Sequence, residues 1–195
     1  GCQVDTALVL VGPQGWRKSS FFRVLGGKWF ADTAMDVSSK DGLMQLAAAW
    51  IYEWGEIENV TSRKEAAEIK MFVTSPRDTF RQPYGRGIIQ HPRSSVIVGS
   101  TNQDQFLNDP TGSRRYHVVR VLAPVDAGPQ GVLTQWRDQL WAEAKEAFLG
   151  GYQWFLSAEE DAEREKDADE YVIEDALQSE IATWLRSGSA QSLVL

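Results

Sequence analysis

A short apolar run, a glycine-containing loop and a helical pattern follow one another near the start of this chain, and they constrain the fold most. Ala7–Val11 is apolar throughout, as expected of a strand buried on both faces. After the loop that begins at Gly12, the apolar residues Phe21, Phe22 and Leu25 recur at helical spacing. This order is typical of a phosphate-binding site, because backbone N–H groups and the positive end of the helix face the loop.

The loop has the side chains that a P-loop needs. Lys18 is expected to reach the β- and γ-phosphates of ATP, and the Ser19 hydroxyl to hold Mg²⁺. Arg17 stands where the usual pattern has glycine, so its side chain must point away from the phosphates or lie over them as an additional cation. The alternative is a chance glycine-rich turn with a surface lysine and serine. The expected nucleotide-binding residues are Gly12, Pro13, Gln14, Gly15, Trp16, Arg17, Lys18, Ser19 and Ser20.

Polar residues after two later apolar tracts are candidates for the chemistry of hydrolysis. Glu53 and Glu56 end the tract that begins at residue 50, where the sheet of an α/β protein presents its ligands. We predict Glu53 as the acid that holds the metal with Ser19, and Glu56 as the base that orients water. Asn102 follows the apolar run 96–99 and is expected to sense the γ-phosphate. Taken alone, each of these residues would be interpreted as a surface charge or a turn residue.

Arg114 and Arg115 precede another short apolar tract. Neighbouring strand residues face opposite ways, so one arginine is expected to reach the phosphates of a neighbouring subunit while the other forms a local ion pair. Arginine fingers stabilise the charge of the transition state in NTPases. A plain surface pair is the alternative.

Cations alternate with aromatic residues between positions 70 and 93, and within this stretch Thr79–Gln90 is predicted to form a hairpin or an ordered loop. Phosphate neutralisation combined with stacking is what a path for single-stranded nucleic acid needs. A subunit contact is the alternative. The predicted DNA-binding residues are Lys70, Arg77, Arg81, Tyr84 and Arg86, with Phe80 and Arg93 interleaved.

Alternating strands and helices predict an α/β domain with a largely parallel central sheet flanked by helices over residues 1–156. A long amphipathic helix is expected beyond Pro129. The net charge of −7 is concentrated in residues 157–175, which hold ten acids and two bases, so the rest of the chain is close to neutral. We expect 157–171 to be a solvated helix or linker, and 157–195 to end in the start of a truncated helical module. On this interpretation the chain is a piece of a longer protein.

The composition excludes several classes of protein. The hydrophobic fraction of 43% is ordinary for a globular interior, and no apolar run is long enough for a membrane span or a signal peptide. The single cysteine, Cys2, fits a reducing compartment, so we expect a cytoplasmic protein. His91 and His117 lie far apart in the sequence, which argues against a zinc site.

The order of these motifs resembles the virulence-associated protein E family, which comprises P-loop proteins of phages and mobile elements related to superfamily 3 helicases. The resemblance covers most of residues 5–156. It rests on Gly12-Pro13-Gln14-Gly15 with Lys18-Ser19, Lys40-Asp41, Trp50-Ile51-Tyr52-Glu53-Trp54-Gly55-Glu56, Ile69-Lys70-Met71-Phe72, Asp78, Arg81-Gln82-Pro83-Tyr84-Gly85-Arg86, Gly99-Ser100-Thr101-Asn102, Gly112-Ser113-Arg114-Arg115-Tyr116 and Leu140-Trp141-Ala142-Glu143-Ala144.

The resemblance implies an AAA+-like P-loop ATPase that acts on single-stranded or forked DNA during replication of a phage or mobile element in a bacterial cell. It also implies a homo-oligomeric ring, a fused or associated primase, and ATP with Mg²⁺ as cofactors. Glu53 would be the acid of the second motif, Asn102 the sensor, and Arg114 or Arg115 the finger given in trans. The alternative is a nucleotide-switched initiator or loading ATPase that holds DNA without unwinding it. A small-molecule kinase is disfavoured, because the sequence shows no obvious lid or acceptor pocket.

Overall fold

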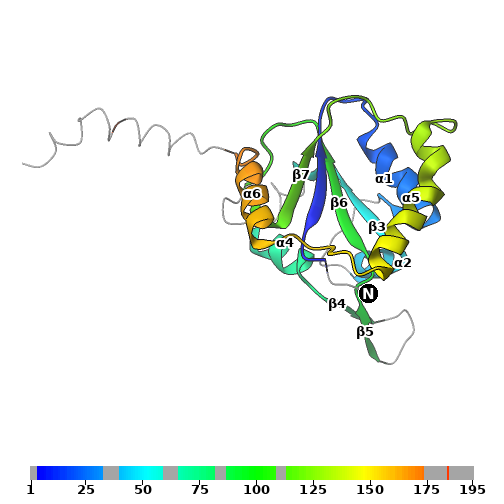
Figure 1. The fold of residues 1–195 in the computed structure, drawn as a ribbon. Coiled ribbons are helices and arrows are strands. Elements are labelled where there is room, and N and C mark those ends of the chain that lie inside the picture. Colours follow the sequence, from blue (N-terminus) through cyan, green and yellow to red (C-terminus); the bar gives the residue numbers. More distant parts are fainter. Residues whose placement is uncertain are drawn as a thin grey trace, which may run out of the picture.

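Five parallel strands form the central sheet of this computed structural model, which describes residues 4–32, 40–58, 66–81, 87–108, 113–173 and 184 (Figure 1). Every neighbouring pair of strands is parallel, so all five carboxyl ends lie at one edge. The α/β class predicted from the sequence is confirmed. Across the sheet the order is β2 (Phe30–Ala31), β3 (Ile51–Gly55), β6 (Val96–Thr101), β1 (Ala7–Val11) and β7 (Tyr116–Arg120).

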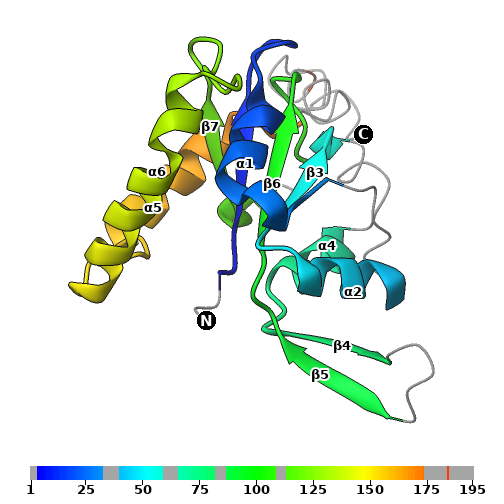
Figure 2. The same cartoon turned by 90° about the vertical axis from the view of Figure 1, so that its right-hand side faces the viewer.

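Helices cover both faces of the sheet (Figures 1 and 2). On one side lie α1 (Lys18–Gly26), the short helix η1 (Gly27–Trp29) and α5 (Val132–Leu149). On the other side lie α2 (Lys40–Ala48), α4 (Ala66–Val73) and α6 (Ala158–Asp169). Among the described residues, no helix is both long enough and apolar enough to cross a bilayer.

The hydrophobic core divides into two clusters because successive strand residues point to opposite faces of the sheet. The cluster under α1 comprises Leu10, Phe22, Ile51 and Val98. The larger cluster on the other face includes Val9, Tyr52, Ile97, Leu46 of α2 and Phe72 of α4. Burial on both faces explains why β1 is apolar throughout. Gly99 has no room for a side chain on this second face, since a Cβ there would lie 2.8 Å from Cδ1 of Ile57.

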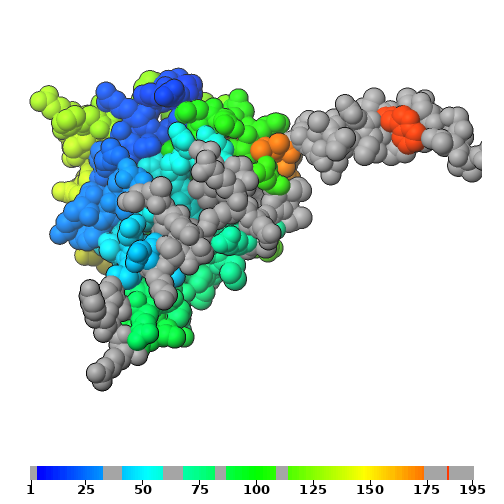
Figure 3. All heavy atoms as spheres, turned by 180° about the vertical axis from the view of Figure 1, so that it is seen from behind, coloured from blue at the N-terminus to red at the C-terminus, as the bar shows by residue number. Residues whose placement is uncertain are grey.

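An antiparallel hairpin of β4 (Arg77–Arg81) and β5 (Ile88–Pro92) projects away from the sheet (Figure 2). Its atoms, drawn in green, reach the lower end of the molecule in Figure 3. The sequence left a hairpin and an ordered loop open for Thr79–Gln90, and the structure shows a hairpin. Residues 82–86, between the two strands, lie outside the described residues.

Helix α6 is the helix of the two alternatives, a solvated helix or a linker, expected over 157–171, but it is not solvated on all sides. Ser157 and Glu160 form a capping box at its start, and Arg164, Ala168 and Tyr171 are buried at helical spacing. Arg164 donates to the carbonyl of Tyr116 at 3.3 Å, which ties α6 to β7. The acidic composition concealed this packing because most acids lie on the outer side of the helix, where they are exposed. The truncated module predicted at the end of the chain lies outside the described residues, apart from Trp184.

Helix α5 is present as predicted, but its apolar side is largely open. Trp136 is 57% exposed and Phe148 is 55% exposed. The helix is held to the end of α1 by two donors, the indole of Trp141 at 3.0 Å and the guanidinium of Arg137 at 3.2 Å, which share the carbonyl of Leu25.

Candidate functional site

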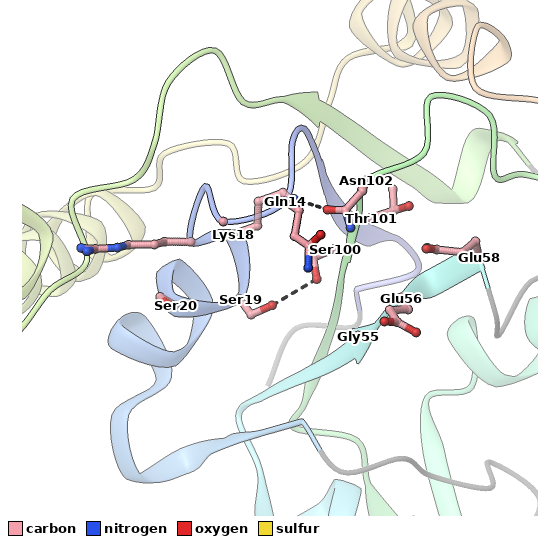
Figure 4. Close-up of a pocket in the computed structure, with 12 residues that line it drawn as sticks. Gln14, Lys18, Ser19, Ser20, Gly55, Glu56, Glu58, Ser100, Thr101 and Asn102 are labelled. Atoms are coloured by element: carbon pink, nitrogen blue, oxygen red, sulfur yellow. Dashed lines mark hydrogen bonds between the residues drawn. The ribbon is translucent and has the colours of Figure 1, made fainter.

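The carboxyl ends of β1, β3 and β6 meet around a pocket of about 390 Å³ (Figure 4). These three strands are neighbours in the sheet, so the segments that follow them converge at one edge. The lining residues come from the loop after β1, the turn after β3 and the end of β6: Gln14, Gly15, Arg17, Lys18, Ser19, Ser20, Gly55, Glu56, Glu58, Ser100, Thr101 and Asn102. The structure therefore brings together Lys18, Ser19, Glu56 and Asn102, which were predicted from separate parts of the sequence. Glu53 does not line the pocket itself but is hydrogen-bonded to Ser100, which does.

Lys18 is the central cation of this pocket. Its side chain is 6% exposed, and its ammonium donates to the carbonyl oxygens of Gly12 (2.7 Å) and Pro13 (3.0 Å) and to Oδ1 of Asn102 (2.8 Å). Burial lowers the pKa of Lys18 from its ordinary value, and the carboxylates of Glu58 and Glu53 oppose this shift. The predicted phosphate cation and the predicted sensor thus contact each other directly.

A chain of hydrogen bonds joins Ser19 to Glu53. Oγ of Ser19 lies 3.2 Å from Oγ of Ser100, whose hydroxyl donates to Oε1 of Glu53 at 2.7 Å. Glu53 is 2% exposed, and its other oxygen, Oε2, is buried with no hydrogen-bond partner in the described part of the chain. A buried carboxylate oxygen without a donor carries a large desolvation cost, which a cation or water would relieve.

The backbone conformation of the loop shows how an arginine is accommodated at position 17, where the usual pattern has glycine. Gly15 has φ = 83° and Arg17 has φ = 59°, both in the left-handed region. Glycine adopts this conformation without strain, which is the physical reason for a glycine before the lysine in the usual pattern. Nη1 of Arg17 lies close to Gly128, 3.3 Å from the point where a Cβ would stand. The side chain of Arg17 thus extends toward the loop before α5, while the ammonium of Lys18 stays with Gly12 and Asn102.

Helix α1 begins without a capping side chain. Its N-cap residue is Arg17, whose side chain accepts no hydrogen bond from the first turn, and no acid lies in that turn. The first N–H groups of a helix have no partner within the helix and favour an anion. This end of α1 opens onto the pocket through Lys18, Ser19 and Ser20.

Two glutamates follow β3 at the rim of the pocket. Glu56 is exposed and takes a left-handed backbone conformation at φ = 52°. Glu58 was missed from the sequence, yet it lines the same pocket, and in Figure 4 its carboxylate points toward the end of β6. Its effect on Lys18 is the larger of the two carboxylate effects. The signal that could have found it is the acidic spacing Glu53, Glu56, Glu58 after one apolar tract.

Comparison with known families decides the relationship of this chain. The model of the virulence-associated protein E-like domain matches residues 1–173. The chain belongs to this family. A comparison with curated proteins finds no match. The structure is also similar to apo structures of the NrS-1 C-terminal region. One is 14% identical in sequence with a TM-score of 0.45, and the match covers 87% of this chain and 35% of that one. Another is 11% identical with a TM-score of 0.47, and the match covers 92% of this chain and 42% of that one. The chain thus spans between about a third and two-fifths of those chains.

In this virulence-associated protein E-like domain, Arg114 and Arg115 lie far from the pocket. They belong to η2 (Ser113–Arg115) and precede β7, whose first residue, Tyr116, pairs with Ala7 at the start of β1. The pocket lies beyond the other end of β1, about 13 Å of strand away at roughly 3.3 Å per residue. Arg114 is exposed, and Arg115 is half-buried with its Nε lacking a hydrogen-bond partner among the residues described. Neither arginine lines the pocket of its own chain.

Two of the predicted DNA-binding arginines of this virulence-associated protein E-like domain lie on the hairpin. Arg77 and Arg81 are exposed on one face of β4, and Lys70 lies on the preceding helix α4. Directly opposed antiparallel residues share a face, so Pro92 and Ile88 of β5, the register partners of the two arginines, belong to this surface. Tyr84 and Arg86 lie outside the described residues.

Two residues interleaved with those cations are structural instead. Phe80 is only 8% exposed, so its ring is not available to stack on a base. Arg93 forms a buried ion pair with Asp78 at 2.5 Å and lies 4.5 Å over the ring of Phe72. Alternation along β4 turns Asp78 and Phe80 inward while the arginines face outward.

Proposed function

We propose that this chain is an ATP-hydrolysing, helicase-type motor that acts on DNA during replication of a phage or mobile element. The observation that carries the proposal is the convergence of three groups on one pocket: a buried lysine ammonium, an uncapped helix N-terminus, and a hydroxyl linked to a buried carboxylate. Together these groups suit a polyphosphate with its metal ion. The parallel sheet with the loop between β1 and α1 supports assignment to the AAA+-like P-loop NTPases.

Binding of ATP begins with the exchange of partners at Lys18. In the structure its ammonium is held by two backbone carbonyls and by Asn102. Phosphate oxygens are stronger acceptors because they are charged, so they would draw the ammonium outward. Asn102 would then be released to contact the γ-phosphate or the attacking water, which is the role of a sensor.

The donor set around Ser19 fits Mg²⁺. Magnesium binds through one or two protein oxygens together with waters and substrate phosphates, so a dense cluster of acids is not required. Among the described residues, no three His, Cys, Asp or Glu side chains form such a cluster. Ser19 and Glu53 are the residues that would hold the ion, and the uncompensated Oε2 of Glu53 supports this assignment. When bound, Mg²⁺ neutralises charge that develops on the phosphates.

Glu53→Gln should retain ATP binding and lose hydrolysis, because an amide lacks the negative charge that a metal and its water require. Glu56→Gln and Glu58→Gln form the comparison set, since both residues line the pocket from the turn after β3. Binding would be measured by fluorescence anisotropy of labelled ATP, and hydrolysis by phosphate release. Parent activity in Glu53→Gln, with loss in Glu56→Gln or Glu58→Gln, would move the catalytic acid to the rim.

The hairpin is proposed as the DNA-binding element. Arg77→Ala and Arg81→Ala should each weaken binding of single-stranded DNA and reduce the salt slope by about 0.7 for each phosphate that is no longer neutralised. Tyr84→Ala should cost about 1–3 kcal/mol if the ring stacks on a base. Lys145→Ala, an exposed cation on α5, is the matched control and should leave DNA binding unchanged. Unchanged affinity in the hairpin variants, with altered oligomerisation, would make this hairpin a subunit interface.

The whole proposal is tested by two assays on the same preparation: ATP hydrolysis with and without single-stranded DNA, and strand displacement on a forked duplex. A motor should show DNA-stimulated hydrolysis together with displacement. Stimulated hydrolysis without displacement would favour a DNA-holding initiator or loading ATPase. We expect the active form to be a homo-oligomeric ring, because the arginine pair lies far from its own pocket. A fused or associated primase is expected from the family resemblance.

A further inference from the structure

We propose that Ser100 is a positioning residue for the magnesium site, which sets the orientation of both Ser19 and Glu53. This inference rests on the proposed function and deepens it. Ser100 is 7% exposed and lies on β6, between Ser19 of α1 on one side and Glu53 of β3 on the other.

The direction of the protons follows from the chemistry of the three groups. A carboxylate oxygen only accepts hydrogen bonds, so the single proton of Ser100 is committed to Oε1 of Glu53 at 2.7 Å. The contact of 3.2 Å between the two hydroxyl oxygens must therefore use the proton of Ser19. Ser19 is the donor, Ser100 the relay and Glu53 the terminal acceptor.

This direction prepares Ser19 for a cation. Because its proton points toward Ser100, the lone pairs of its oxygen are directed elsewhere, and Ser19 lines the pocket. A hydroxyl binds a metal through these lone pairs. The same relay holds the Glu53 carboxylate in one orientation, which leaves Oε2 as its uncommitted oxygen. Groups that orient metal ligands in this way typically change metal affinity or activity by about 10- to 100-fold when they are removed.

Strand pairing explains why Ser100 can link the two residues. Gly55 is its register partner on β3, and Glu53 pairs with Val98, so Glu53 and Ser100 lie two positions apart on the same face of the sheet. That face is covered by α1, which begins with Lys18 and Ser19. The relay therefore joins three elements at the base of the pocket.

The test separates binding of nucleotide from binding of the metal. The affinity of a fluorescent ATP analogue for the full chain would be measured by anisotropy in EDTA and across a titration of MgCl₂. Ser100→Ala should lose little affinity for the analogue in EDTA, because the hydroxyl of Ser100 contacts Ser19 and Glu53 and not the ammonium of Lys18. It should need about 10- to 100-fold more Mg²⁺ to reach half of the magnesium-dependent gain in affinity. Ser100→Thr keeps the hydroxyl and should restore the parent titration.

Ser95→Ala is the matched control. Ser95 is 6% exposed, immediately precedes β6, and its hydroxyl binds the carbonyls of Leu46 and Ala49, away from the pocket. Both serine-to-alanine variants lose a buried hydroxyl and should lose thermal stability, but only Ser100→Ala should shift the magnesium titration.

Equal magnesium titrations for Ser100→Ala and the parent would overturn the role of Ser100 while leaving the nucleotide site intact. A shift of the same size in Ser95→Ala would also overturn it, because the effect would then be general destabilisation. Absence of nucleotide binding by the parent, with and without Mg²⁺, would reject the proposed function and this inference together.

Discussion

Lys18→Ala is expected to weaken ATP binding by about 10- to 100-fold and to remove measurable hydrolysis. A hydrogen bond to a charged group is worth about 1.5–3 kcal/mol, and each 1.4 kcal/mol corresponds to a factor of about ten. The effect should be large because Lys18 is buried at the base of the pocket, where water replaces a missing cation poorly. Anisotropy of labelled ATP and phosphate release are the measurements.

Lys28→Ala is the control for this first prediction. Lys28 lies beyond the other end of α1, where its ammonium stands 4.4 Å from the centre of the Trp29 ring. Its loss should alter neither binding nor hydrolysis. Lys18 also satisfies the carbonyls of Gly12 and Pro13, so a thermal melt of each variant is needed to show that the fold survives. Parent-level hydrolysis by folded Lys18→Ala would reject the phosphate-loop assignment.

A mixture of two inactive variants should recover hydrolysis if the arginine pair completes the site of a neighbour. Lys18→Ala subunits retain the arginines, and Arg115→Ala or Arg114→Ala subunits retain the loop. An interface between one of each contains one intact site. An arginine finger is worth about 10³–10⁵ in rate, so recovery should stand far above the background of either variant alone. Each arginine variant should still bind ATP, since both side chains lie at the opposite edge of their own sheet.

The two mixtures together identify the finger. Arg114 is exposed and Arg115 is half-buried, so the two variants need not behave alike. Arg23→Ala removes an arginine from an exposed ion pair with Asp32 and is the matched control, with parent activity expected. If both mixtures stay inactive while every variant assembles with parent subunits, the shared site does not exist and the pair is structural.

Local sequence patterns were sufficient to predict the strands and the helix that carry the candidate site. The apolar run before Gly12 and the helical spacing after Lys18 predicted β1, the loop and α1, because each depends on neighbours in the sequence. The tract ending at Glu53 and the run ending before Asn102 predicted β3 and β6 in the same way. That these ends meet follows from parallel pairing, so the sequence also indicated which residues would converge.

The sequence-based expectations that differ from the structure share one cause. Composition does not show which face of a helix or strand packs against the rest of the protein. Arg93 and Phe80 belong to a basic and aromatic stretch, yet strand alternation and the partner Asp78 place them inside. Acidic residues around Arg164 suggested a solvated helix or a linker, yet one face of helix α6 packs on β7. The predicted stripe on α5 exists, but nothing in the described structure covers most of it.

The sequence by itself determined the class of fold, the loop that precedes Lys18 and Ser19, and the family, because these depend on local order along the chain. Tertiary structure alone decided which atoms touch. The register between β3 and β6 places Ser100 between Ser19 and Glu53, and the turn after β3 brings Glu58 to the pocket. It also carries Arg114 and Arg115 to the far edge of the sheet. Lys18 and Asn102, which touch in the pocket, are 84 positions apart, and no local pattern contains such a contact.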